Sequence, residues 1–261
     1  MNYCARDKDI DFVEEKGRYC SGAGLGIILV DEIYPAFPGD VRNPRSFPYP
    51  IQYEVAEGLD IQKLIRSENK EQYLAETIRA AKKLERMGCR AILGECGYFA
   101  YFQKEVTDSV NVPVFMSSLL QIKWAQSVIG SNKVVGVLMS GKDDLLEKHL
   151  TSVGVELGSN YVVGGVMDGG RCKQFHLLWD CRFREGPARA SYLEAEKDFV
   201  ESAIAFYNEN NNMGAMILEC TGFPPFARAV QRAIDIPVFS WGTMMDFAYS
   251  VVRHRDYYGN I

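Results

Sequence analysis

Two cysteines, Cys96 and Cys220, stand at equivalent points of an internal repeat. Read forward from each cysteine, positions 96–115 and 220–239 match without a gap, and both stretches close on Pro-Val-Phe. A thiolate is a soft, weakly hydrated base, and a second thiol can deliver a proton to the opposite side of a substrate. Two such groups facing each other are suited to moving a proton on a carbon atom next to a carboxylate.

The residues around each cysteine predict a strand before it and a helix after it. Short apolar runs at 91–93 and 215–218 indicate buried strands. The apolar residues after each cysteine advance by 3, 4 and 4, which is one face of a helix. They are Phe99, Phe102, Val106 and Val110 in one copy and Phe223, Phe226, Val230 and Ile234 in the other. Backbone N–H groups at such a turn can lower a thiol pKa and bind a carboxylate.

The rest of the chain repeats the same alternation. Apolar segments at 26–30 and 135–139 predict two further strands, and the spacing of apolar residues predicts helices over 70–87, 145–153 and 191–208. Strands that alternate with helices indicate an α/β protein with a parallel sheet in each half. Ligands of such sheets bind at the carboxyl ends of the strands, where both cysteines fall.

Residues 31–53 break this pattern because they hold five of the ten prolines. Proline restricts its own backbone and that of its predecessor, so we expect a stiff, extended loop above the carboxyl end of the first strand. The loop carries Arg42 and Asn43. One interpretation is a surface excursion. The favoured one is a wall or lid of a pocket, because long ordered loops are often functional.

A glutamate, Glu95 or Glu219, precedes each cysteine. If these carboxylates face the pocket, they oppose thiolate formation or bind a substrate cation. If they face away, they are structural. Adjacent residues of a strand point to opposite faces of the sheet, which favours the second interpretation.

Composition narrows the class of protein. The chain has 261 residues, 47% hydrophobic and 24% charged, as in a soluble protein of one large or two small domains. A net charge of −5 without a basic cluster argues against nucleic-acid binding. The first 19 residues show no secretory signal and no apolar run could span a membrane, so we expect a cytoplasmic protein without membrane contact.

We expect neither a metal nor an organic cofactor. Seven cysteines without a secretory signal indicate reduced thiols, and the three histidines and the cysteine spacing do not fit a zinc site. The glycine-rich segment 22–26 precedes a strand instead of following one, so it is not a dinucleotide-binding loop.

At the two cysteines the sequence resembles the aspartate/glutamate racemase superfamily, which includes amino-acid and hydantoin racemases, maleate isomerase and arylmalonate decarboxylase. The resemblance runs from about residue 24 to 249 and includes Thr221, the Pro-Val-Phe segments and the strand at 133–138. It implies two pseudo-symmetric three-layer α/β domains with parallel sheets and an active site in the cleft between them. In this superfamily the chain end returns to the first domain, so we expect domains at 1–120 plus 239–261 and at 121–238.

The resemblance also implies cofactor-independent chemistry, with Cys96 and Cys220 as catalytic residues and a small carboxylate as substrate. Relatives are commonly dimers, so we expect a homo-oligomer. Racemases usually carry Asn-Thr after the first cysteine, where this sequence differs. The candidate substrate-binding residues are Asn43, Gly97, Tyr98, Ser117, Ser140, Thr221 and Gly222.

Three functions fit these features. The first is a racemase or epimerase that moves the Cα proton of an amino acid or related carboxylate and needs both thiols. The second is a lyase, decarboxylase or isomerase on the same scaffold, in which the two cysteines act unequally. The third is a ligand-binding protein without catalysis, against which the retention of both cysteines argues.

For a racemase we expect Cys96→Ser and Cys220→Ser each to abolish turnover, because a serine hydroxyl is a far weaker acid than a thiol at the same position. Steady-state turnover checks the prediction, and circular dichroism checks that each variant is folded. A single variant with full activity would exclude a racemase that uses two bases.

Overall fold

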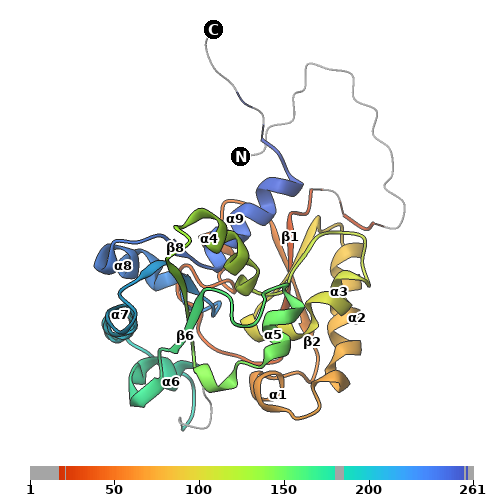
Figure 1. The fold of residues 1–261 in the computed structure, drawn as a ribbon. Coiled ribbons are helices and arrows are strands. Elements are labelled where there is room, and N and C mark those ends of the chain that lie inside the picture. The colour runs from red at the N-terminus through yellow and green to blue at the C-terminus, as the bar shows by residue number, and fades with distance from the viewer. Residues whose placement is uncertain (1–17, 21, 180–184, 256, 258–261) are drawn as a thin grey trace.

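The computed structural model describes residues 18–20, 22–179, 185–255 and 257, which form two parallel sheets with helices around them (Figure 1). The strand orders are β2-β1-β3-β4 and β6-β5-β7-β8, so the two halves repeat one topology. The predicted α/β fold with a parallel sheet in each half is confirmed. The strands are β1 (Leu25–Val30), β2 (Ile51–Ala56), β3 (Ala91–Gly94), β4 (Val114–Phe115), β5 (Val134–Met139), β6 (Tyr161–Gly165), β7 (Met213–Leu218) and β8 (Val238–Phe239).

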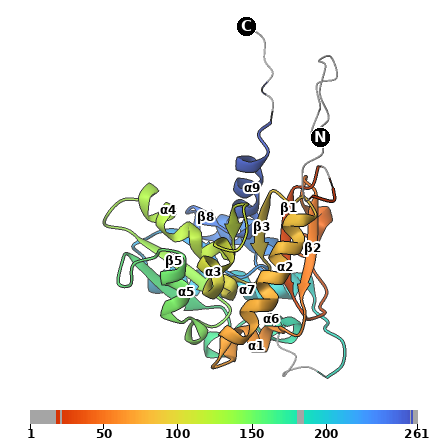
Figure 2. The ribbon, with the colours of Figure 1, turned by 90° about the vertical axis from the view of Figure 1, so that its right-hand side faces the viewer.

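The helices lie around the sheets. In Figure 1, α6, α7 and α8 lie on the side of the second sheet, and Figure 2 shows α2 crossing the first sheet. The helices predicted over 70–87 and 191–208 are α2, preceded by a 3-10 turn, and α7. The helices are α1 (Ile61–Arg66), α2 (Leu74–Arg86), α3 (Gln103–Thr107), α4 (Gln121–Val128), α5 (Glu147–Ser152), α6 (Lys173–Trp179), α7 (Tyr192–Glu209), α8 (Pro224–Ile234) and α9 (Trp241–Val252).

The sequence patterns did not reveal β2 and β6. Both are edge strands and only partly buried, so neither shows the continuous apolar run of a central strand. The expectation of an irregular loop over 31–53 is therefore wrong at its end. The connection covers 31–50 with a 3-10 turn at Pro44–Ser46, and residues 51–53 pair with β1 in parallel.

The repeat around the cysteines is visible in the structure. Cys96 follows β3 and Cys220 follows β7, and the two Pro-Val-Phe segments enter β4 and β8. The helices begin differently from the prediction. A 3-10 helix, Gly97–Phe102, comes between Cys96 and α3, and α8 begins only at Pro224. The α-helix N-termini therefore lie further along the chain than the two cysteines.

The last helix crosses from the second sheet to the first. Trp241, Met244, Met245 and Ala248 of α9 form one buried cluster with residues of β1 and β3. The indole Nε1–H of Trp241 donates to the backbone carbonyl of Glu219 at 2.6 Å, which ties this helix to the end of β7. The proposed domain limits remain a prediction, and residues 1–17 of the first domain lie outside the described residues.

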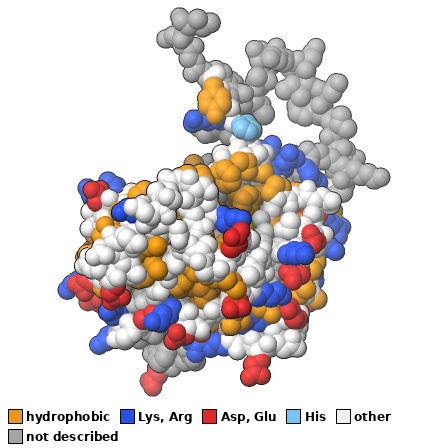
Figure 3. Space-filling view, viewed as in Figure 1, with side chains coloured by type: hydrophobic (Ala, Val, Ile, Leu, Met, Phe, Trp, Pro, Cys, Tyr) orange, Lys and Arg blue, Asp and Glu red, His pale blue; other side chains and the backbone are white. Residues whose placement is uncertain are grey.

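Two observations concern the surface. Within the described ranges, none of the helices is both long and apolar enough to cross a membrane. On the face seen in Figure 3, acidic and basic side chains are interspersed, so this face is neither mainly acidic nor mainly basic.

Candidate active site

The carboxyl ends of the central strands of both sheets meet around two small buried cavities. Cys96, Cys220 and Ile61 line both cavities. We name the cavities by the glutamate that lines each of them. The Glu219 chamber, of about 60 Å³, is lined by Ile61, Gln62, Ile65, Arg66, Cys96, Tyr98, Ser140, Asp144, Met167, Phe175, Glu219 and Cys220. The Glu95 chamber, of about 30 Å³, is lined by Val30, Glu32, Tyr34, Ile61, Glu95, Cys96, Cys220 and Thr221.

The two thiols have matching surroundings. The backbone N–H two residues further on, that of Tyr98 for Cys96 and that of Gly222 for Cys220, acts to lower the pKa of each thiol. Burial raises the pKa of both thiols, and the charge of nearby Glu219 raises it further. Both cysteines are therefore neutral thiols in the empty site, and thiolate formation needs a change in the charge around them.

Several expected substrate-binding residues lie at these chambers. The Tyr98 hydroxyl donates to the Gly141 carbonyl at 3.2 Å and lies 3.5 Å from Ser140 Oγ, so the two halves meet through it. Tyr98 and Ser140 line the Glu219 chamber, while Thr221 lines the Glu95 chamber. Gly97 lies directly against the Glu219 carboxylate, where a Cβ atom would overlap with it. These residues supply hydroxyl and backbone donors around the thiols.

Four of the seven expected substrate-binding residues do not line either chamber: Asn43, Gly97, Ser117 and Gly222. Two of them make local contacts instead. The Asn43 side-chain amide donates to the Ala36 carbonyl at 3.4 Å within its own loop. Ser117 is buried and accepts the Leu119 N–H at 3.2 Å, as the cap of a short 3-10 turn. These side chains satisfy local backbone groups, and their expected role in substrate binding stays a prediction.

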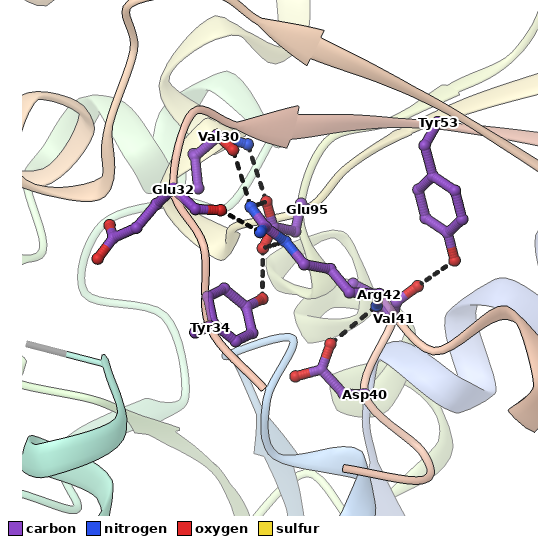
Figure 4. Close-up of polar contacts among 8 residues, drawn as sticks. All are labelled: Val30, Glu32, Tyr34, Asp40, Val41, Arg42, Tyr53 and Glu95. Carbon is purple, nitrogen blue, oxygen red and sulfur yellow. Dashed lines mark hydrogen bonds and ion pairs between the residues drawn. The ribbon is translucent and has the colours of Figure 1, made fainter. Parts of the chain in front are cut away.

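Glu95 is held by a dense polar network (Figure 4). Its carboxylate pairs with the Arg42 guanidinium, with Nε at 2.5 Å and Nη2 at 2.7 Å, and also accepts the Tyr34 hydroxyl and the Val30 N–H. Arg42 donates in addition to the carbonyls of Glu32 and Val30. A bidentate pair of this kind is the strong form of an ion pair. It connects the proline-rich loop to the end of β3, immediately before Cys96.

Glu219 occupies the equivalent position in the second half but is unpaired. Its side chain is 1% exposed, and neither carboxylate oxygen has a hydrogen-bond partner. Burial raises its pKa to about 8. The expectation that both glutamates face away from the pocket is wrong. Both follow the last strand residue, so the alternation of side chains within a strand does not extend to them.

The difference between the two glutamates comes from the loops opposite them. The connection 31–50 delivers Arg42 to Glu95. The equivalent connection, 140–160, is of similar length, but its basic residues lie elsewhere. Lys142 is exposed, and Lys148 pairs with Glu71 at 3.0 Å. Arg66, at the edge of the Glu219 chamber, lies 3.8 Å from Asp144. The repeated backbone therefore holds one neutralised carboxyl group and one that lacks a counter-charge.

No cluster of three or more His, Cys, Asp or Glu side chains suited to a metal ion occurs in the part of the chain that the structure describes. The two chambers bring together thiols, hydroxyls and carboxyl groups, and among the carboxyl groups Glu219 is buried and unpaired.

Known structures share this architecture. A sulfate-associated variant of arylmalonate decarboxylase superposes with a TM-score of 0.56 at 10% identity, covering 88% of this chain and 92% of that one. A glutamate racemase from Bacillus anthracis superposes with a TM-score of 0.54 at 13% identity, covering 88% and 81%. The chain thus shares the fold of arylmalonate decarboxylase and of glutamate racemase, which confirms the α/β fold with two parallel sheets that the resemblance implied.

The chain also has relatives by sequence. The chain is 28% identical over 233 residues to a dimethylsulfoniopropionate lyase of Durusdinium sp. clade D, covering 86% of this chain and 73% of that protein. It is 27% identical over 232 residues to dimethylsulfoniopropionate lyase 7 of Emiliania huxleyi, covering 84% and 64%. Three further lyases of Emiliania huxleyi are matched over 46% to 56% of their length. No family model matches the chain.

We expect Arg42→Met to lower the free energy of unfolding by about 3–5 kcal/mol, because it leaves the Glu95 carboxylate buried without a counter-charge. Urea denaturation measures the change. Arg45→Met, an exposed arginine of the same loop, is the control and should stay within about 0.5 kcal/mol of the wild type. An equal effect of the two substitutions would contradict a structural role for the Arg42–Glu95 pair.

The unpaired Glu219 predicts a pH-dependent stability. Its pKa is about 8 in the folded protein against an ordinary 4.5, so the folded state binds more protons between these values and stability falls as the pH rises through them. We expect Glu219→Gln to flatten the decline between pH 6 and 9 and to be more stable at pH 9 by roughly 3–5 kcal/mol. Burial also raises the pKa of Asp40 to about 8. The free energy of unfolding of the variant should therefore still fall somewhat with pH. Urea denaturation at several pH values tests this, and parallel curves for both proteins would refute it.

Proposed function

We propose that this protein is a lyase that cleaves dimethylsulfoniopropionate, or a close relative of it, by removing a proton next to the carboxylate. The observation that carries the proposal is the pair of thiols, Cys96 and Cys220, lining the same buried cavities at the carboxyl ends of both sheets. The leaving group is inferred from the sequence relatives, which are lyases of this substrate. The relatives are longer than this chain, so activity and substrate are both proposals.

The reaction needs one base and balances without a cofactor. A thiolate takes a proton from the carbon next to the carboxylate and becomes a thiol. The electron pair of that C–H bond forms the new C=C bond. The bond between the neighbouring carbon and the positive sulfur breaks, and its electrons neutralise the sulfur. The products are acrylate and dimethyl sulfide, and the thiol returns its proton to solvent.

The residues around the thiols suit this step. The carboxylate gains negative charge as the proton leaves, and hydroxyl donors already held in place stabilise that charge. Thr221, Ser140 and Tyr98 provide such hydroxyls at the chamber walls. Dimethyl sulfide leaves as a neutral molecule, so no acid is required for it. The two cysteines therefore act unequally, one as base and the other as a neutral neighbour.

Racemisation of a small carboxylate is the second candidate. The equivalent backbone N–H contacts of the two thiols favour it, because racemisation needs an acid and a base of similar strength on opposite faces of the substrate. On this alternative, proton removal is followed by return of a proton from the other side, with no leaving group.

Incubation with dimethylsulfoniopropionate in heavy water, followed by NMR, separates these functions. We expect acrylate and dimethyl sulfide, with a larger loss of rate for one Cys→Ser variant than for the other. Deuterium exchange with inversion on a panel of amino acids, without acrylate, would instead establish a racemase. Neither product nor exchange, together with thermal stabilisation by a ligand, would identify a binding protein.

A further inference from the structure

The Glu219 carboxyl group has no explanation in the reaction outlined above. It is buried, makes no hydrogen bond through its side chain, and lines the same chamber as both cysteines. A buried carboxylate without a partner lowers the stability of the folded state, so proteins rarely keep one that has no function. Its position is secured through its backbone, whose carbonyl accepts Ser118 Oγ at 2.9 Å and the Trp241 indole N–H at 2.6 Å. Gly97 leaves room for the side chain.

The equivalent glutamate shows what is missing. Glu95 has the Arg42 guanidinium, while in the described part of the second half no cationic side chain bonds to Glu219. The space beside Glu219 is a cavity that opens between apolar and aromatic side chains, including Met167, Phe175 and Tyr98. Such a surface accepts methyl groups, and aromatic rings attract a cation that carries them.

We propose that Glu219 is the residue that recognises a cationic group on the substrate, so that the site selects a short carboxylate carrying a methylated onium centre. The proposal rests on the lyase function for the choice of sulfonium as the natural cation. The cation lies against the Glu219 carboxylate, and its methyl groups contact Met167 and Phe175. The substrate carboxylate extends past the cysteines toward the Glu95 chamber, where Arg42 already neutralises the Glu95 carboxylate.

The same contact couples recognition to base formation. When Glu219 is ionised, its charge opposes ionisation of both thiols, as does burial. A bound cation offsets that charge and itself favours a thiolate nearby. A carboxylate ligand of the same shape without the positive charge brings no such compensation. Selectivity for the cation therefore acts on the strength of the base as well as on binding.

Two ligands of equal shape test the proposal by calorimetry: 3-(trimethylammonio)propanoate and its carbon analogue 4,4-dimethylpentanoate, which keeps the carboxylate but lacks the positive charge. We expect the wild type to bind the ammonium ligand about 30-fold or more tightly than the carbon analogue, as for other buried charge pairs. Glu219→Gln should reduce this preference to about threefold or less. Asp143→Asn, which removes an exposed carboxylate of the same loop outside the chamber lining, should retain most of it.

Proton release gives an independent readout. Because the pKa of Glu219 is about 8, the empty site holds a protonated carboxyl group at pH 7, and cation binding expels that proton. Calorimetry in buffers of different ionisation enthalpy should show release with the cationic ligand only. The other titratable or charged groups lining the chamber are Cys96, Cys220, Tyr98, Asp144 and Arg66. Release that persists in Glu219→Gln would assign the proton to one of these and overturn the role of Glu219.

Further outcomes are distinguishable. The inference is overturned if Glu219→Gln keeps the preference for the cation, or if it weakens the binding of both ligands equally. This holds even if dimethylsulfoniopropionate is cleaved. A preference that depends on Glu219 in a protein that forms no acrylate supports the inference while refuting the lyase function. Thermal unfolding shows whether the Gln variant is folded, and Glu219→Leu repeats the measurement if it is not.

Discussion

The ion pair between Arg42 and Glu95 is the interaction on which the site depends. It joins the proline-rich connection of 20 residues, 31–50, to the end of β3. The connection is thereby held next to the first cysteine. The guanidinium also bonds to two backbone carbonyls at the end of β1 and just beyond it, which fixes the loop at both sides. Without this charge, Glu95 would be a second buried carboxylate beside the thiols.

The same ion pair makes the two repeated halves of the protein differ in charge. The two halves share strand order, cysteine position and the N–H contact to each sulfur. They differ in the charge beside the cysteines, because Glu95 is neutralised and Glu219 is not. A racemase gains from equal halves, whereas an elimination that expels a neutral leaving group needs a single base. The asymmetry of charge thus favours the elimination proposed above over racemisation.

The limits of the sequence patterns are physical. The central strands and long helices were predictable because their apolar faces are buried and follow a fixed period, as in α2 and α8. The edge strands β2 and β6 were not, since half of their surface lies outside the core. Asn43 and Ser117 have side chains that suit a substrate site, yet they satisfy nearby backbone groups, and side-chain type alone does not separate these uses.

The sequence by itself determined the α/β alternation, the duplication and the pairing of Cys96 with Cys220, because each of these is carried by local periodicity or by direct self-similarity. Only the tertiary structure decided which glutamate is neutralised. Arg42 lies 53 positions before Glu95, and no local rule connects them. Whether a buried charge is paired depends on which distant side chain reaches it, so the unpaired Glu219, and the cation proposed for it, became visible only once the chain was folded.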